Sequence, residues 1–128
     1  MHYLLIAFGG ALGSVARYWL STVVDQRLNS GFPWGTLGVN VTGCLLIGVL
    51  ACLDAGDRLI GSTQTRFFLM TGLCGGYTTF SSFSLQTLSL LKEGNWPLGL
   101  AYVLGSVLLC LGGVWLGHAG AGWLQAAR

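Results

Sequence analysis

Thr71–Ser84 reads TGLCGGYTTFSSFS and lies in a longer segment, Phe67–Leu91, that contains no Asp, Glu, Lys or Arg. Its closely spaced glycines, followed by Thr78 and Thr79, are poor helix formers in succession. We therefore predict that a helix breaks here, at about the middle of a membrane. Carbonyls freed in lipid each cost several kcal/mol, so a break survives only where they find partners, for which a small cation is suitable. Alternatively, the segment stays helical and its glycines serve close packing.

The composition of the whole chain indicates a membrane protein. Of its 128 residues, 53% are hydrophobic and only 8% are charged, whereas a soluble domain carries about 25% charged residues. This excludes an ordinary soluble enzyme, a disordered chain and a nucleic-acid binder with a basic face. The net charge of +2 is too small to imply an acidic partner. What remains is a single non-enzymatic domain in a lipid bilayer.

Further uncharged segments predict the rest of the fold. A spanning helix needs roughly 20 apolar residues, and no charged residue occurs in Leu28–Leu53 or Gly94–Ala127. We expect an all-α membrane domain over residues 1–128. Its four spans are predicted at about 3–24, 35–53, 66–91 and 97–117. The first has no basic leader and is expected to be retained rather than cleaved as a signal peptide.

The distribution of basic residues predicts no preferred orientation. Single-orientation proteins concentrate Lys and Arg on one side of the membrane. With four spans, each side of this chain receives three: Arg58, Arg66 and Arg128 on one, and Arg17, Arg27 and Lys92 on the other. Either orientation can then insert, and an antiparallel, dual-topology homodimer is a natural product. The alternative is a fixed orientation set by weak signals or by a partner.

Small residues predict close helix contacts. The Gly-x-x-x-Gly pairs at 9 and 13, 72 and 76, and 113 and 117 let backbones approach closely, which is typical of a tight bundle or a dimer. The four cysteines contain no Cys-x-x-Cys pair and are interpreted as small apolar core residues.

Polar and aromatic side chains form stripes on three of the predicted spans. Phe80, Phe83, Ser84 and Thr87 share one helical face, with Ser81 beside it. The second span contributes Thr36 and Asn40, and the fourth contributes Tyr102 and Ser106. Hydroxyl and amide donors together with positive ring edges, without a lysine, favour a path for an anion. Each hydroxyl by itself could instead bond to its own helix.

Three stretches of the chain resemble the small bacterial fluoride channels of the Fluc or CrcB family. They are GGALGSVAR at 9–17, PWGTLGVN at 33–40 and GGYTTFSSF at 75–83. The resemblance implies a fluoride-selective channel in the bacterial inner membrane, which exports fluoride passively and lowers its toxicity. It also implies an antiparallel homodimer with two narrow pores.

The resemblance also implies roles for individual residues. Asn40 matches the pore amide, and Phe80 and Phe83 match the paired phenylalanines whose ring edges meet the ion. The carbonyls of Gly75 and Thr78 match a structural sodium site at the dimer centre. Further matches are polar pore positions at Thr36, Ser81, Tyr102 and Ser106, and a first-span arginine at Arg17. The chain departs from the family pattern at Tyr77, Ser82, Gln86 and Val114.

Two questions stay open at the level of sequence. Arg17 either attracts anions at a water-filled mouth, or snorkels or caps a neighbouring helix end. The function could also be that of a small multidrug antiporter or of a non-transporting assembly subunit. An antiporter needs a titratable acid within a span, whereas the acids here are expected in the connections: Asp25, Asp54, Asp57 and Glu93.

Overall fold

The computed structural model describes residues 1–55 and 62–127, and all of its regular structure is helical. Asp57, Arg58 and Arg128, which entered the charge arguments, lie outside these residues. The elements are α1 (His2–Leu28), α2 (Trp34–Ala55), α3 (Thr63–Arg66), η1 (Phe67–Cys74), α4 (Gly75–Tyr77), α5 (Phe80–Lys92) and α6 (Trp96–Ala126).

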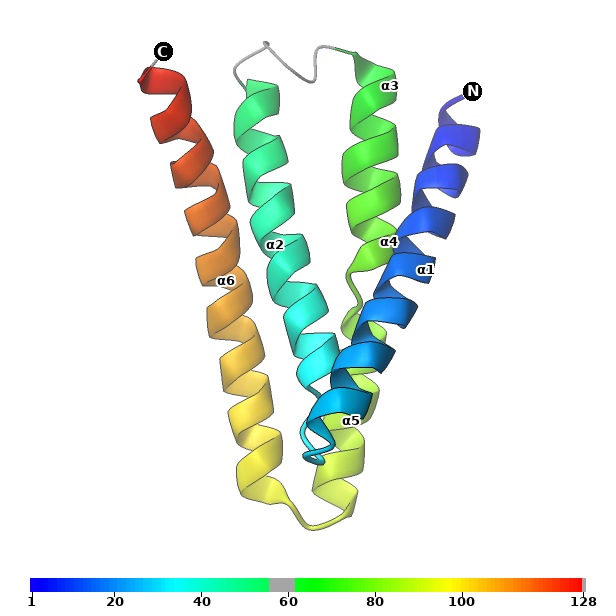
Figure 1. Cartoon of the computed structure of the whole chain (residues 1–128), viewed down its shortest axis with the longest axis vertical. Helices are drawn as coiled ribbons and strands as arrows, with labels where there is room; N and C mark the ends of the chain where they lie inside the picture. Colours follow the sequence, from blue (N-terminus) through cyan, green and yellow to red (C-terminus); the bar gives the residue numbers. More distant parts are fainter. Residues whose placement is uncertain (56–61, 128) are drawn as a thin grey trace.

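The helices run up and down the length of one bundle (Figure 1). The start of α1 and the end of α6 lie at the same end of the bundle as the last turn of α2 and the start of α3. The connections 29–33 and 93–95 lie at the opposite end. The third crossing is made by α3, η1, α4 and α5 in succession, so the architecture is four helices with an interrupted third.

The predicted break in the third helix is confirmed, and it falls on the threonines rather than on the glycines. Thr78 (φ −86°, ψ 156°) and Thr79 (φ −150°, ψ 117°) are extended, and the helix resumes at Phe80. The Thr79 hydroxyl accepts a hydrogen bond from the Ser82 N–H at 3.2 Å, as a helix N-cap does. Gly75 and Gly76 remain helical. The break is therefore set by a residue that can start a new helix.

Several helices extend beyond the ranges expected from the uncharged segments. Asp25 and Asp54, which we expected in connections, lie in the last turns of α1 and α2. Both carboxylates have partners: Asp25 Oδ1 accepts from the Gly35 N–H at 2.7 Å, and Asp54 forms a two-pronged ion pair with Arg66. Charged residues mark where a helix leaves the apolar layer, and they do not end the helix itself.

Glycine faces bring the helices close together within one chain. A Cβ on Gly13 of α1 would lie 2.7 Å from the backbone nitrogen of Tyr77, and one on Gly72 would lie 3.1 Å from the Cα of Gly9. On the other side of the bundle, a Cβ on Gly113 of α6 would lie 3.1 Å from the Val41 carbonyl oxygen of α2. The close contacts predicted from the Gly-x-x-x-Gly pairs are present, and they hold the single chain together.

The outer surface is apolar. Over the described residues, α1, α2 and α6 are each long and apolar enough to cross a membrane. Large side chains such as Tyr3 and Phe8 of α1 and Leu108 and Trp115 of α6 are exposed. Exposed apolar area on this scale is typical of a surface covered by lipid or by another chain.

Candidate functional site

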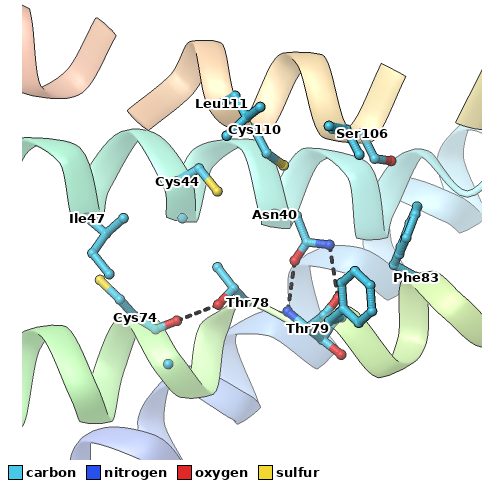
Figure 2. A pocket seen from close by; sticks show the side chains of 14 residues that line it. Asn40, Cys44, Ile47, Cys74, Thr78, Thr79, Phe83, Ser106, Cys110 and Leu111 are labelled. Carbon is cyan, nitrogen blue, oxygen red and sulfur yellow. Dashed lines mark hydrogen bonds between the residues drawn. The ribbon is translucent and has the colours of Figure 1, made fainter. Parts of the chain in front are cut away.

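One cavity of about 450 Å³ lies where α2, the break in the third helix, the first turn of α5 and α6 meet (Figure 2). It brings together several residues that are far apart in the sequence. Of the side chains predicted to line a path, Asn40, Phe80, Phe83 and Ser106 border it, as do the backbone positions Gly75 and Thr78. Thr36, Ser81 and Tyr102 do not border it.

Asn40 joins α2 to the break. Its Oδ1 accepts a hydrogen bond from the Thr79 N–H at 2.8 Å, and its Nδ2 donates to the Thr79 carbonyl at 3.0 Å (Figure 2). The amide thereby replaces the helical partners that Thr79 loses because its backbone is extended. A primary amide has two N–H donors, so one of them is left for a group in the cavity.

The two phenylalanines of the stripe lie next to one another at the start of α5. Their ring centroids are 5.4 Å apart with an interplanar angle of 46°. Phe83 also packs against Tyr102 of α6 at 5.2 Å, which fixes its ring. Phe80 is 78% exposed in the single chain. The i, i+3 spacing therefore predicted that the rings of Phe80 and Phe83 lie together. The exposure of Phe80 leaves one side of this ring pair uncovered.

The hydroxyl groups divide into those that face the cavity and those that are used elsewhere. The Ser106 Oγ is buried in the cavity wall and has no hydrogen-bond partner among the residues that the structure describes. Tyr102 is fully buried and donates to Gln86 Oε1 at 2.9 Å. Ser84 and Thr87 bond to carbonyls of their own helix, the alternative noted for single hydroxyls.

The remaining two polar positions predicted to line a path also lie outside the cavity. The Ser81 Oγ lies 3.2 Å from the Thr79 Oγ1. Thr36 is buried in α2. Among the hydroxyl-bearing side chains that the sequence predicted to line a path, Ser106 is therefore the one that lines the cavity with a buried hydroxyl that has no hydrogen-bond partner within the described ranges.

The break leaves backbone oxygens without helical partners. The Gly76 carbonyl accepts from Arg17 Nε at 3.2 Å and from Ser14 Oγ at 3.4 Å. The Thr79 N–H, which would be the partner of the Gly75 carbonyl in a continuous helix, donates to Asn40 instead, and the Ser82 N–H, which would serve the Thr78 carbonyl, donates to the Thr79 hydroxyl. Unpaired carbonyl oxygens are the ligands that hard cations prefer. Arg17 acts here as a cap on a neighbouring helix end.

Two partners in this region were missed by the sequence analysis. Thr79 was identified only as a poor helix former, although Thr followed by a helical segment is a recognisable N-cap signal. Gln86 was noted only as a departure from the family pattern, and no local pattern shows that it meets Tyr102 sixteen residues later. Such pairings depend on how two helices are rotated about their axes.

Comparison with known proteins gives a consistent picture. A family model described as "CrcB-like protein, Camphor Resistance (CrcB)" matches residues 4–118. A protein of Opitutus terrae named "Fluoride-specific ion channel FluC" is 55% identical over 128 residues, covering 98% of this chain and 96% of the relative. Proteins with the same name from Rhodospirillum rubrum and Paramagnetospirillum magneticum are 53% and 50% identical; the chain is covered to 94% and 93%, and the relatives to 95% and 94%.

Proposed function

Because the chain belongs to the CrcB family, we propose that it is a fluoride-selective channel that lets fluoride leave the cytoplasm passively and so lowers its toxicity. The observation that carries this proposal is the identity of 55% over 98% of the chain to a protein named as a fluoride-specific ion channel. The chain acts by conduction and not as an enzyme. We place it in the bacterial inner membrane.

The neutrality of the cavity supports conduction of an anion. Its hydrogen-bond donors include the spare N–H of Asn40 and the Ser106 hydroxyl, the rings of Phe80 and Phe83 add positive edges, and its lining contains no Lys or Arg. Neutral donors replace part of the hydration of an anion without holding it as a fixed cation would. Fluoride is small and tightly hydrated, so close donors suit it better than the larger chloride. The site residues Thr36, Ser81 and Tyr102 would extend this polar track beyond the cavity.

The direction of transport follows from the membrane potential. Hydrogen fluoride crosses the membrane as a neutral acid and ionises in the cytoplasm. An inside-negative potential then favours exit of the anion by about 2.3 kcal/mol per 100 mV. No coupling to another ion is needed.

We further propose that the working unit is an antiparallel, dual-topology homodimer. Two features support it: Phe80 is 78% exposed, and this exposed side chain belongs to the lining of the cavity. A second copy would cover both and complete two pores. The carbonyls of Gly75 and Thr78, whose helical donors bond elsewhere, fit a structural sodium ion, because each copy would contribute two hard oxygen ligands.

Fluoride efflux from liposomes tests the proposal. Purified protein in fluoride-loaded vesicles is expected to release fluoride, and to leave chloride in matched vesicles. Phe80→Leu should slow the release about 2- to 10-fold, since an aromatic edge interaction is worth about 0.5–1.5 kcal/mol. Phe8→Leu is the matched control, because Phe8 is also exposed but lies on α1 away from the cavity. Vesicles that retain fluoride would refute the channel, and an unchanged Phe80→Leu rate would refute the assigned site.

A further inference from the structure

Three of the four cysteines line the cavity: Cys44, Cys74 and Cys110. Cys44 and Cys110 come from the neighbouring helices α2 and α6, although they are 66 residues apart in the sequence. Cys44 of α2 and Cys110 of α6 both line it, and both are half-buried free thiols (Figure 2). The helices approach closely at this level, since a Cβ on Gly113 would lie 3.6 Å from the Cβ of Cys44. Figure 2 shows both sulfur atoms in the space between α2 and α6 that opens into the cavity. From the sequence, each was interpreted as a small apolar core residue.

The surroundings determine which ligand a thiol pair can take. Sulfur ligands select soft metal ions. A structural zinc ion takes four protein ligands, and within residues 1–55 and 62–127 no group of three His, Cys, Asp or Glu side chains could hold a metal. The class of metal ion that remains is a soft ion that is coordinated by only two sulfur atoms.

The net charge of the metal–thiolate complex decides between monovalent and divalent ions. Two thiolates with a monovalent ion such as Ag⁺ form a complex of net charge −1, and the cavity lining offers no Lys or Arg to balance it. A net charge inside the membrane is costly. Two thiolates with a divalent ion form a neutral complex. Hg²⁺ is divalent, soft and commonly two-coordinate.

We propose that Cys44 and Cys110 form a dithiol site for a soft, two-coordinate divalent cation, with Hg²⁺ as the defining ligand. Binding forms two Hg–S bonds and releases the two thiol protons to water, and nothing is oxidised or reduced. The bound ion lies in the wall of the cavity that also holds Asn40 and Ser106. Mercury should therefore inhibit fluoride efflux. This consequence rests on the proposed channel function, whereas the binding of mercury by the two cysteines does not depend on it.

Metal retention by the purified protein tests the site without any measurement of transport. The protein is loaded with HgCl₂ in detergent and washed with excess glutathione, and mercury per chain is then counted by mass spectrometry. A chelating pair should retain one ion per chain. Cys44→Ser and Cys110→Ser should each lose it, because glutathione competes readily with a single thiol. Cys52→Ser is the matched control and should retain the ion, since Cys52 is on α2 but outside the cavity.

A second measurement needs no variant and holds even if a substitution prevents folding. X-ray absorption of the mercury-loaded, unmutated protein, with no external thiol present, should show two sulfur ligands. One sulfur ligand, or full retention of mercury by Cys44→Ser, would overturn the proposal. Inhibition of efflux without retained mercury would also count against it, because the inhibition would then arise elsewhere.

Discussion

Replacement of Asn40 by alanine should destabilise the whole fold, because this side chain provides both hydrogen bonds of the extended Thr79 backbone. Asn40→Ala removes the acceptor 2.8 Å from the Thr79 N–H and the donor 3.0 Å from its carbonyl oxygen. Each buried polar group left without a partner costs about 1–3 kcal/mol. Two such groups give an expected loss of about 2–6 kcal/mol in the free energy of unfolding.

Reversible unfolding in SDS, followed by circular dichroism, measures this loss. Amide hydrogen exchange locates it, because the Thr79 N–H should exchange much faster in the variant while the amides of α6 keep their protection. The matched control is Ser89→Ala. The Ser89 hydroxyl is exposed and bonds only to the Leu85 carbonyl of its own helix at 3.1 Å. Its removal should change the free energy of unfolding by less than about 0.5 kcal/mol.

The reasoning is refuted if Asn40→Ala unfolds within about 0.5 kcal/mol of the unmutated chain. It is also refuted if stability falls but the Thr79 amide stays protected, since the loss would then come from another contact. A fall in fluoride efflux at unchanged stability would assign Asn40 to the ion path alone and not to the support of the break.

The remaining predictions concern stability and use the same SDS assay. Gly13→Ala should cost about 1–3 kcal/mol because the added Cβ would overlap the backbone of α4, whereas Gly105→Ala, which has open space, should cost nothing; equal effects would contradict the close packing of α1. Asp25→Ala should cost about 0.5–2 kcal/mol by removing a hydrogen bond from the first turn of α2, and an unchanged stability would show that this cap is dispensable. Tyr102→Phe should cost about 1 kcal/mol through the lost bond to Gln86, and Gln86→Leu combined with it should add little further loss.

The helical segments could be predicted because local composition determines them. Runs without charge set where the chain can enter a membrane, and Thr78 and Thr79 before Phe80 set where the third helix stops. The expected positions of Asp25 and Asp54 were wrong for a related reason. Hydropathy reports the thickness of the apolar layer, and a helix continues past that layer when its end finds a partner.

The site could be predicted only in part. The pairing of Phe80 with Phe83 follows from their spacing on one helix, and the need of Asn40 for a partner follows from the cost of a bare amide in lipid. That Tyr102 bonds to Gln86 and lies outside the cavity could not be inferred, since it depends on the rotation of α6 against α5. The same holds for the meeting of Cys44 and Cys110.

By itself, the sequence determined that the chain is helical, that it is built for lipid, and that its third helix is interrupted, since each of these properties arises within a run of neighbouring residues. Only the tertiary structure decided which polar groups are satisfied by the chain itself and which still face the cavity. Helices of the same composition can pack at many rotations and depths, and the close approach of glycine faces selects one of them.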